Sequence, residues 1–479
     1  MNERFDVIVV GAGLSGCVAA LTVARGGRTV LLIERGRRPG SKNVIGGILY
    51  TPVLDRLFPD FAQAAPVERH VVARSFGLLT PQAHVAVEVR SEAFAAAPDH
   101  NRSYTIRRTA FDPWLLAQAR AAGAAVVPGT VVEELLHAEG DPAGPVVGVR
   151  CGRAGGEVRG AVVILAEGAN ALLAEAEGLR PRTAPDEVML GVKEVLELDR
   201  GVLEDRFAVE GGAGRAFEFF GDPVLGGFGS GFVYTNTDSL SVGLTVSLAH
   251  LRRLGVPPPA LLDRFKAHPS VRRLIRGAAP VEYCAHLLPV GSARGLPRLV
   301  KDGLLLCGDA ARLANMSHYK EITNLVSAAG LAAGEAALEA LAQGDVSAHG
   351  LAGYGARLRA GFVLQDLEKF APLAELMERS PELLERYPRL LVEALVKHFT
   401  VSDRPKAELE REILRAWNRE VKPAQLRRDM VGVLEAMGFA LVPLMRRLVA
   451  PSLRPGLGWL QALWPFGRRR DAGRAGGGA

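Results

Sequence analysis

The chain has 479 residues, 48% of them hydrophobic, which is too long for one compact core, so we expect two or three domains. Its formal net charge is +6, but the basic residues do not accompany any nucleic-acid-binding motif, which argues against nucleic acid as a partner. The four cysteines have no CxxC pair and no metal-ligand spacing, which predicts a reducing compartment and no metal site, and Cys17 and Cys307 lie in apolar segments, which predicts that these two are buried.

The two ends of the chain bear on its location. Residues 2–6 are polar, so we expect no secretory leader, and we expect no membrane-spanning helix because no uninterrupted apolar run of about 20 residues is apparent. Residues 437–470 alternate apolar patches with arginines and include Trp459, Trp464 and Phe466. This pattern is typical of a segment lying on a membrane surface, or of a helix docked on protein. The prediction is a cytoplasmic protein, peripheral on the cytoplasmic face of the inner membrane.

The first predicted unit is a dinucleotide-binding βαβ unit over residues 6–36. An apolar strand leads into Gly11, Gly13 and Gly16 of a GxGxxG motif, which serve a tight turn, the approach of a pyrophosphate and close helix–strand packing, respectively. A second strand ends at Glu34, at the spacing of a ribose-binding carboxylate. The cofactor-binding residues expected here are Gly11, Ala12, Gly13, Gly16, Glu34 and Arg35.

Later segments distinguish between NAD and FAD. Arg108 begins a predicted helix that ends near Ala122, and an apolar strand over Val162–Gly168 ends in a small-residue turn. A third apolar strand, within Gly303–Ala311, ends in Gly-Asp. A helix start there stabilises negative charge near the pyrimidine end of a flavin, and Asp309 can accept a hydrogen bond from a ribityl hydroxyl. Together, the glycine motif, the strand over 162–168 and the strand that ends in Gly-Asp favour FAD over NAD.

The order of these motifs requires a discontinuous FAD-binding domain. We assign to it residues 1–75, 104–170 and 296–370, and to a β-sheet substrate domain residues 76–103 and 171–295. Alternation predicts strands in the second set at Val85–Val89, Met189–Leu198, Ala216–Phe220, Gly231–Thr235 and Leu240–Val246. Residues 371–436 are predicted to form a helical cap or docking region, broken into short helices by Pro372, Pro381, Pro388 and Pro423, and residues 437–479 a basic amphipathic tail.

The motif order resembles the FAD superfamily that includes p-hydroxybenzoate hydroxylase and geranylgeranyl reductases. Four segments narrow the resemblance: PGSKNVIGG (39–47), GVKEV (191–195), GFVYTN (231–236) and EYCAH (282–286). They resemble the FixC family, the flavoprotein subunits of FixABCX (EtfABCX) complexes, close to electron-transfer-flavoprotein:quinone oxidoreductase. The resemblance runs from residue 5 to about residue 430. It departs at Glu167, where the family usually has Asp, and in residues 312–325, which keep Glu321 and Asn324 but lose the family's glycines.

The resemblance implies an α/β fold, with a glutathione reductase-type Rossmann-like FAD domain, an inserted β-sheet substrate domain and a helical C-terminal region. It implies an FAD-dependent oxidoreductase that takes electrons from the α and β subunits of an electron-transfer flavoprotein. Quinone and a ferredoxin-like FixX-type subunit are the implied acceptors, and electron bifurcation would split electrons between them. Single-chain relatives hold an iron–sulfur cluster on C-terminal cysteines. This chain has no cysteine after Cys307, so a cluster must come from another polypeptide.

The site residues follow from the motifs and the resemblance together. Further cofactor-binding residues are expected at Lys42, Gly46, Gly47, Arg108, Val131, Ala166, Gly168, Gly308, Asp309 and Asn324. The isoalloxazine performs the electron transfer, so no catalytic constellation is required, and the candidates are Lys42, Tyr283 and His286. Lys42 is either a cation beside reduced flavin or a solvated lysine, and Tyr283 and His286 either meet a quinone or support the sheet. The Lys193–Glu194 pair predicts either a strand-edge ion pair or a site lining.

Three other functions stay open. A prenyl reductase would share the fold and the FAD motifs, with a deep apolar tunnel beside the flavin. A flavin monooxygenase would need contacts for NAD(P)H, which we do not identify. A non-catalytic FAD relay subunit would bind the flavin without turning over a small molecule.

Overall fold

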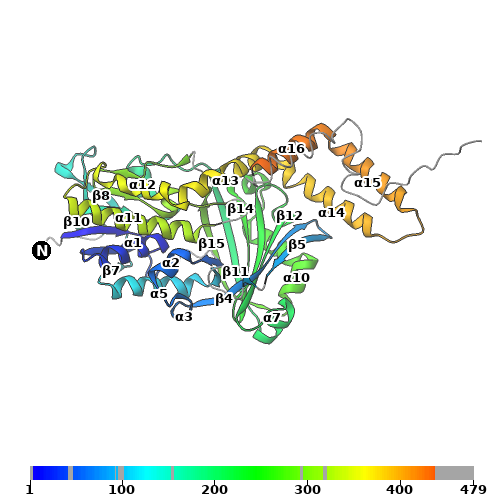
Figure 1. Cartoon of the computed structure of the whole chain (residues 1–479), viewed down its shortest axis with the longest axis horizontal. Helices are drawn as coiled ribbons and strands as arrows, with labels where there is room; N and C mark the ends of the chain where they lie inside the picture. Colours follow the sequence, from blue (N-terminus) through cyan, green and yellow to red (C-terminus); the bar gives the residue numbers. More distant parts are fainter. Residues whose placement is uncertain are drawn as a thin grey trace, which may run out of the picture.

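The computed structural model describes residues 4–40, 47–91, 93–94, 102–152, 156–291, 295–316 and 321–436. Two β-sheets lie side by side along the long axis, and the helices α14 (Arg386–Phe399) and α15 (Lys406–Glu420) extend beyond the second sheet (Figure 1). Lys42, Gly46, the centre of the 312–325 loop and the predicted tail over 437–479 lie outside the described residues.

The first sheet carries the predicted dinucleotide-binding unit. Its order is β16-β17-β10-β1-β2-β7, with β1 parallel to both β10 and β2. Its strands are β1 (Arg4–Val10), β2 (Val30–Glu34), β7 (Ala125–Pro128), β8 (Val132–His137), β9 (Val146–Cys151), β10 (Glu157–Leu165), β16 (Val300–Lys301) and β17 (Leu304–Leu306). Val7–Val10 of β1 are all buried, as expected for a central parallel strand covered on both faces. The expected strand–turn–helix–strand order is confirmed.

Small residues let two helices approach closely beside this sheet. The helices α1 (Leu14–Arg25) and α11 (Thr323–Gln343) pack together, and α1 also contacts α5 (Arg108–Ala121). A Cβ added at Gly330 of α11 would lie 2.2 Å from the carbonyl oxygen of Ser15, so glycine sets the separation of the two helices. Short helices α2 (Pro52–Leu57), α3 (Phe61–Ala64) and α6 (Leu172–Ala176) complete this half.

One helix departs from the expected absence of a long apolar run. By length and composition, α11 is apolar enough to cross a membrane, and 61% of its most apolar window is buried inside the protein. The run is inconspicuous in the sequence because nearly half of its residues are alanine or glycine rather than large apolar side chains.

The second sheet has the order β15-β11-β14-β13-β12-β4-β6-β3, with β5 beside β4. Its strands are β3 (Ile48–Tyr50), β4 (Val67–Leu79), β5 (His84–Arg90), β6 (Ser103–Ile106), β11 (Val188–Glu197), β12 (Ala213–Gly221), β13 (Gly229–Thr235), β14 (Ser239–Ser247) and β15 (Ala279–Pro289). All five strands expected in this region are confirmed. β4 runs through residue 75, where we placed a domain boundary, and pairs along its length within this sheet.

The two faces of the second sheet have different partners. One face packs on α7 (Arg200–Phe207), α8 (Leu248–Leu254), α9 (Pro258–Ala267) and α10 (Pro269–Ile275), through a core that includes Phe207, Phe219 and Phe265. The opposite face carries Glu218, Phe232 and His286 into a cavity shared with the first sheet. Alternation along each strand therefore divides its residues between the core and the cavity.

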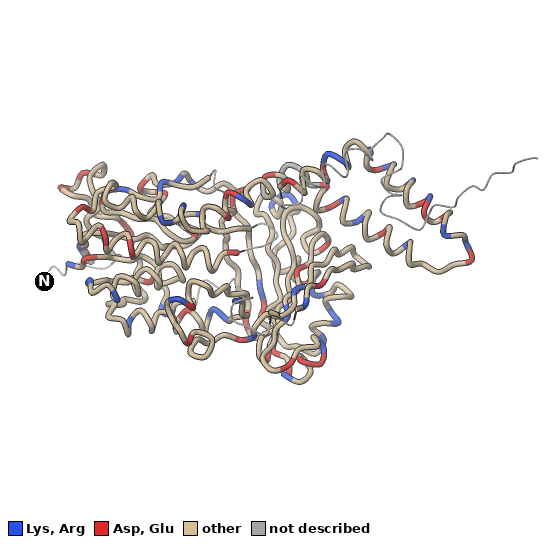
Figure 2. Tube along the Cα trace, viewed as in Figure 1, with Lys and Arg blue, Asp and Glu red and all other residues tan. Residues whose placement is uncertain are grey.

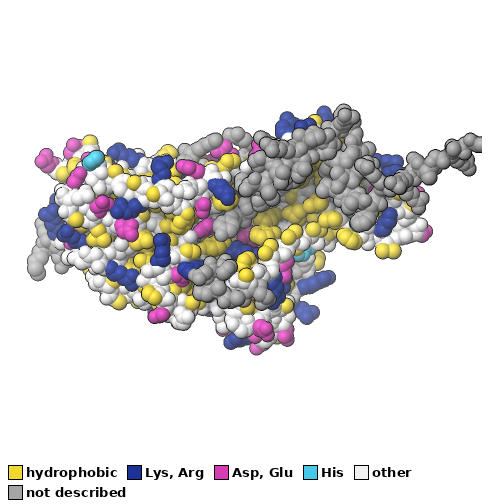
Figure 3. Space-filling model, viewed as in Figure 1, with side chains coloured by type: hydrophobic (Ala, Val, Ile, Leu, Met, Phe, Trp, Pro, Cys, Tyr) yellow, Lys and Arg dark blue, Asp and Glu magenta, His cyan; other side chains and the backbone are white. Residues whose placement is uncertain are grey.

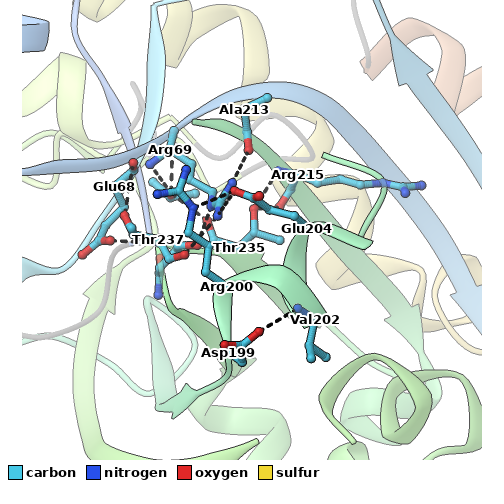
Figure 4. Close-up of polar contacts among 12 residues, drawn as sticks. Glu68, Arg69, Asp199, Arg200, Val202, Glu204, Ala213, Arg215, Thr235 and Thr237 are labelled. Atoms are coloured by element: carbon cyan, nitrogen blue, oxygen red, sulfur yellow. Dashed lines mark hydrogen bonds and ion pairs between the residues drawn. The ribbon is translucent and has the colours of Figure 1, made fainter. Parts of the chain in front are cut away.

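A buried arginine joins the elements at one end of this sheet (Figure 4). Arg69 of β4 is 1% exposed and donates from Nε to the carbonyl of Asn236 (2.6 Å) and from Nη1 to that of Ala213 (3.1 Å). Its Nη2 donates to the carbonyl of Thr237 (3.0 Å) and forms an ion pair with Glu204 (2.9 Å). One guanidinium thus ties β4 to β12, to the β13–β14 hairpin and to α7.

The C-terminal helices are α12 (Gly353–Ala360), α13 (Phe362–Arg379), α14 (Arg386–Phe399), α15 (Lys406–Glu420) and α16 (Pro423–Ala436). The expectation that Pro372 breaks a helix is wrong, because Pro372 lies inside α13. Buried Leu367, Ala371 and Leu373 hold the turns on either side of this proline, so packing offsets its missing N–H.

The α14–α15 hairpin projects from the body (Figure 1). Both charge signs alternate along it (Figure 2), and Arg389–Glu393 forms one of its ion pairs, at 3.2 Å. Hydrophobic side chains gather where the second sheet meets these helices, on the face drawn in Figure 3.

Candidate functional site

A cavity of about 500 Å³ lies between the two sheets. Its walls are the carboxyl ends of β1, β2 and β10 on one side and the inner face of the second sheet on the other. The carboxyl ends of parallel strands are the usual ligand site of doubly wound sheets, and cavities of ~300–1,000 Å³ suit cofactor-sized ligands.

The glycine turn opens one end of this cavity. Gly11 has φ +104°, and a Cβ there would lie 2.3 Å from the carbonyl oxygen of Ala166. At Gly16, a Cβ would lie 1.9 Å from the carbonyl oxygen of Gly11, so this glycine permits close packing of the helix on the turn. Gly13 differs, because it lines the cavity and a Cβ there would meet no protein atom within 4 Å. The open space beside Gly13 leaves its backbone accessible to a ligand.

Glu34 lies at the end of β2 on the same cavity wall. Its carboxylate accepts hydrogen bonds from the backbone N–H groups of Ala12 (2.9 Å) and Gly36 (2.6 Å). Arg35 and Val131 also line this end. The two amides fix the carboxylate beside the glycine turn, and its remaining lone pairs can accept from hydroxyl groups.

Asp309 supplies a buried acceptor farther along the cavity. Its Oδ1 is buried and has no hydrogen-bond partner among the described residues. Burial raises the pKa of this carboxyl group to about 6, although the charge of Arg108 lowers it. An orphaned carboxylate oxygen that faces a cavity fits a hydroxyl-bearing ligand such as the ribityl chain of a flavin.

Arg108 has an intramolecular partner. Its Nε and Nη2 donate to Asp112 at 2.5 and 2.8 Å, and both side chains are buried. Both residues also line the cavity. The pair therefore brings a guanidinium to the site with its charge already balanced by a carboxylate.

The remaining expected cofactor residues divide into two groups. Gly47, Ala166 and Gly168 line the cavity, whereas Gly308 and Asn324 do not. Asn324 donates to Glu321 (2.9 Å) and accepts from the backbone N–H of Val53 (3.3 Å), so it ties the first turn of α11 to α2 and to the segment just before the helix.

The two described catalytic candidates lie on opposite faces of β15. His286 lines the cavity, and its buried Nε2 has no hydrogen-bond partner among the described residues. Burial and the charges of Arg108 and Arg35 lower its pKa to about 4, so the imidazole is neutral at pH 7. Tyr283 is three positions earlier, 51% exposed and outside the cavity, because an odd spacing along a strand turns it to the other face.

Lys193 and Glu194 are adjacent in β11, so their side chains also point to opposite faces of the sheet. Glu194 forms an ion pair with Lys266 of α9 at 2.8 Å. Lys193 is 0% exposed, and its Nζ has no hydrogen-bond partner in the described part of the chain. The Glu194 ion pair is therefore made with a helix rather than along a strand edge, since β11 lies between β14 and β15, and Lys193 is not among the residues that line the cavity.

The sequence departs from the family pattern at Glu167 and in the loop that begins at Arg312, and the side chains of both residues form contacts with nearby groups of the protein. Glu167 accepts from the backbone N–H groups of Leu173 (3.0 Å) and Ala174 (2.9 Å), where it caps the start of α6. Arg312, after the Gly-Asp strand, has φ +57° and pairs with Glu187 at 2.7 Å.

A polar cluster at the second-sheet end of the cavity was not predicted from the sequence. Tyr50, Glu218 and Tyr234 line this end, and Arg74 donates to the hydroxyl oxygen of Tyr50 at 2.9 Å. Burial raises the pKa of Tyr234 well above its ordinary value, and the charge of Glu218 adds to that rise. Phe232 stacks on Tyr234, with ring centroids 4.8 Å apart. The sequence signal was Glu218, a charge within a run of phenylalanines.

Comparisons with known proteins agree with this geometry. A profile of the "FAD dependent oxidoreductase" family matches residues 6–180, and one of the "ETF-QO/FixC family C-terminal domain" matches residues 373–438. Protein FixC of Azorhizobium caulinodans is 41% identical over 419 residues, which cover 87% of this chain and 95% of that protein. A probable electron transfer flavoprotein-quinone oxidoreductase of Escherichia coli is 39% identical over 415 residues, covering 86% and 94%.

Solved structures share the fold. A geranylgeranyl bacteriochlorophyll reductase-like protein of Thermoplasma acidophilum has a TM-score of 0.65 at 20% identity, covering 88% of this chain and 100% of that one. The myxobacterial chondrochloren halogenase has a TM-score of 0.60 at 21% identity, covering 82% and 89%. At these identities the likeness shows the fold alone.

The fold and the cavity define an FAD-dependent oxidoreductase, in which FAD is the cofactor that carries electrons. The chain belongs to the FixC and electron transfer flavoprotein-quinone oxidoreductase family.

Proposed function

We propose that this chain accepts electrons from an electron-transfer flavoprotein and passes them through FAD to quinone, to a ferredoxin-like partner, or to both. The observation that carries the proposal is the relationship to FixC, at 41% identity over 95% of that protein's length. The cavity supports it, because one continuous space joins the glycine turn to a polar and aromatic end on the second sheet.

The flavin would extend along this cavity. The backbone around Gly13 would hold its pyrophosphate, Glu34 a ribose and Asp309 the ribityl chain. The other cavity-lining residues that we assign to FAD are Ala12, Arg35, Gly47, Arg108, Val131, Ala166 and Gly168. The isoalloxazine would then lie toward the second sheet, beside His286.

The polar cluster gives the second-sheet end its chemistry. The phenols of Tyr50 and Tyr234 can donate hydrogen bonds to the carbonyl oxygens of a quinone. The stacked ring of Phe232 offers a flat apolar surface for a quinone ring. A prenyl reductase would need an apolar tunnel here, and Glu218 with Arg74 makes this end charged instead.

Quinone dissolves in the bilayer, so this function requires contact with a membrane surface. We propose that the chain is peripheral on the cytoplasmic face and that its basic C-terminal tail, or a partner subunit, makes that contact. The electron-transfer flavoprotein subunits and a FixX-type ferredoxin would complete the assembly.

The proposed hydrogen bond to Asp309 makes a prediction about pH. Because burial raises its pKa to about 6 from an ordinary 3.8, the ionised carboxylate destabilises the folded protein without FAD above pH 6. This destabilisation disappears as the pH falls through about 6 towards 3.8. In flavin-free protein at neutral pH, Asp309→Asn should therefore raise the free energy of unfolding, by on the order of 2 kcal/mol.

The same substitution should weaken FAD binding, because a neutral amide replaces a charged acceptor. The expected loss is about 1–2 kcal/mol, or roughly 5–30-fold in Kd. Denaturant unfolding of the flavin-free protein and fluorescence titration with FAD measure the two effects. If the Asp309→Asn protein binds FAD as tightly as the original, Asp309 does not belong to the flavin site.

Electron flow is tested with the purified, FAD-loaded chain, a reduced electron-transfer flavoprotein and a short-tailed quinone. We expect quinol formation that depends on both proteins and that slows with Tyr234→Phe at unchanged FAD content. Flavin reduction without quinol formation, in the presence and absence of a FixX-type ferredoxin, would replace the quinone proposal with the relay function.

A further inference from the structure

Lys193 occupies an unusual place in the second sheet. On its strand β11 it lies between Gly243 of β14 and Cys284 of β15, its register partners on either side. Register partners point to the same face of a sheet. Beyond Gly243 the next register partner is Phe232, and His286 lies two residues along from Cys284. Because Phe232 and His286 both line the cavity, Lys193 lies on the cavity side of the sheet, between them.

Charged groups of both signs act on Lys193. Arg107 and Arg108, at the start of α5, both act on it electrostatically, and Cys284 and Glu282 are the groups that favour its charge. The one carboxylate that acts on Lys193, Glu282, has an arginine partner, Arg107, at 3.6 Å. Among the described residues, the Lys193 ammonium therefore forms no ion pair with a carboxylate.

This arrangement is costly without a ligand. A fully buried ammonium that makes no hydrogen bond destabilises the folded state, and burial correspondingly lowers the pKa of Lys193. His286 is neutral and supplies no compensating negative charge. A leucine or methionine would fill the same space without this penalty, so the position makes physical sense if a negative charge enters the cavity.

We propose that Lys193 stabilises the negative charge that the flavin ring acquires on reduction. FAD that takes up two electrons and one proton becomes an anion, and a nearby ammonium in a low-dielectric site favours that form over the neutral oxidised one. The inference rests on the placement of the isoalloxazine beside His286 given above. Lys193 acts on the cofactor through its charge and is a positioning and tuning residue.

The experiment compares flavin midpoint potentials in the FAD-loaded full chain, titrated with dithionite against a reference dye. Lys193→Met should lower the ratio of reduced to oxidised flavin at a fixed potential about tenfold, which is a shift of about 30 mV to more negative potential for a two-electron couple. Lys193→Arg should keep most of the original potential, because it keeps the charge. Lys193→Gln provides a second neutral variant if the methionine variant folds poorly.

Lys266→Met is the matched control. Lys266 pairs with Glu194, the next residue of the same strand on the opposite face, so this substitution removes one lysine charge at a distance from the cavity. Its flavin potential should stay unchanged. Equal potentials in the Lys193→Met and original proteins, or equal shifts in the Lys193→Met and Lys266→Met proteins, would overturn the proposal.

The titration uses neither quinone nor an electron-transfer flavoprotein. A chain that fails to reduce quinone but shows the Lys193-dependent shift would therefore contradict the proposed electron flow and leave the role of Lys193 standing.

Discussion

A Gly13→Val protein is expected to fold and to lack flavin. Gly13 has φ −76° and ψ −174°, an extended conformation that valine adopts, and a Cβ there would meet no protein atom within 4 Å. The added side chain would instead occupy the cavity beside the glycine turn, in the path proposed for the pyrophosphate. We expect FAD affinity to fall by at least about 100-fold, or ~2.7 kcal/mol, with a circular dichroism spectrum like that of the flavin-free original.

Gly16→Ala serves as the contrasting variant. Its Cβ would lie 1.9 Å from the carbonyl oxygen of Gly11, so the turn itself must move. This protein should lose stability whether or not FAD is present. A yellow Gly13→Val protein with normal FAD content would show that the pyrophosphate does not pass Gly13.

Arg69→Ala is expected to have the largest effect on stability. The guanidinium is buried and bonded to three carbonyl groups and one carboxylate, which belong to β12, the β13–β14 hairpin and α7 (Figure 4). Its removal takes the guanidinium donor away from those carbonyl groups and opens a cavity, and each buried group left unsatisfied typically costs ~1–3 kcal/mol. Urea unfolding followed by circular dichroism measures the loss.

Arg200→Ala is the control for charge. Arg200 also pairs with Glu204, at 2.9 Å, but its side chain is 57% exposed. Exposed pairs contribute little, so this variant should unfold close to the original midpoint. Similar unfolding midpoints for the Arg69→Ala and Arg200→Ala proteins would show that Arg69 does not anchor the sheet.

Local sequence determined the part of the site that lies within one short segment. The glycine turn of residues 11–16 and Glu34 at the end of β2 belong to one βαβ unit, so spacing alone placed them together. Asp309 could also be predicted from its own segment, because it closely follows an apolar strand, and that strand belongs to the same sheet.

The opposite end of the cavity could not be predicted in this way. Tyr50, Arg74, Glu218 and Tyr234 come from four strands, and their meeting depends on the register of β3, β4, β12 and β13. Register is fixed by long-range packing rather than by any one segment. Long-range packing also decides which face of a strand turns toward the cavity. For this reason the sequence did not distinguish Tyr283 from His286 as a residue of the site.

Packing also overrode local rules at two helices. Pro372 predicts a break, yet α13 continues through it because its neighbours are buried. In α11, alanine and glycine contribute little to the hydrophobicity of the sequence, so the helix was not recognised as a long apolar run. Their small size lets α11 pack closely against α1, which determines its position.

We propose above all that electrons pass through the FAD of this chain on their way from an electron-transfer flavoprotein to quinone. Sequential-mixing stopped-flow spectroscopy tests it most directly, with the FAD-loaded chain mixed first with reduced electron-transfer flavoprotein and then with a short-tailed quinone. We predict that the oxidised-flavin absorbance of this chain bleaches after the first mixing and returns after the second, as quinol forms. Quinol formation while that absorbance stays constant, or bleaching that quinone does not reverse, would contradict the claim.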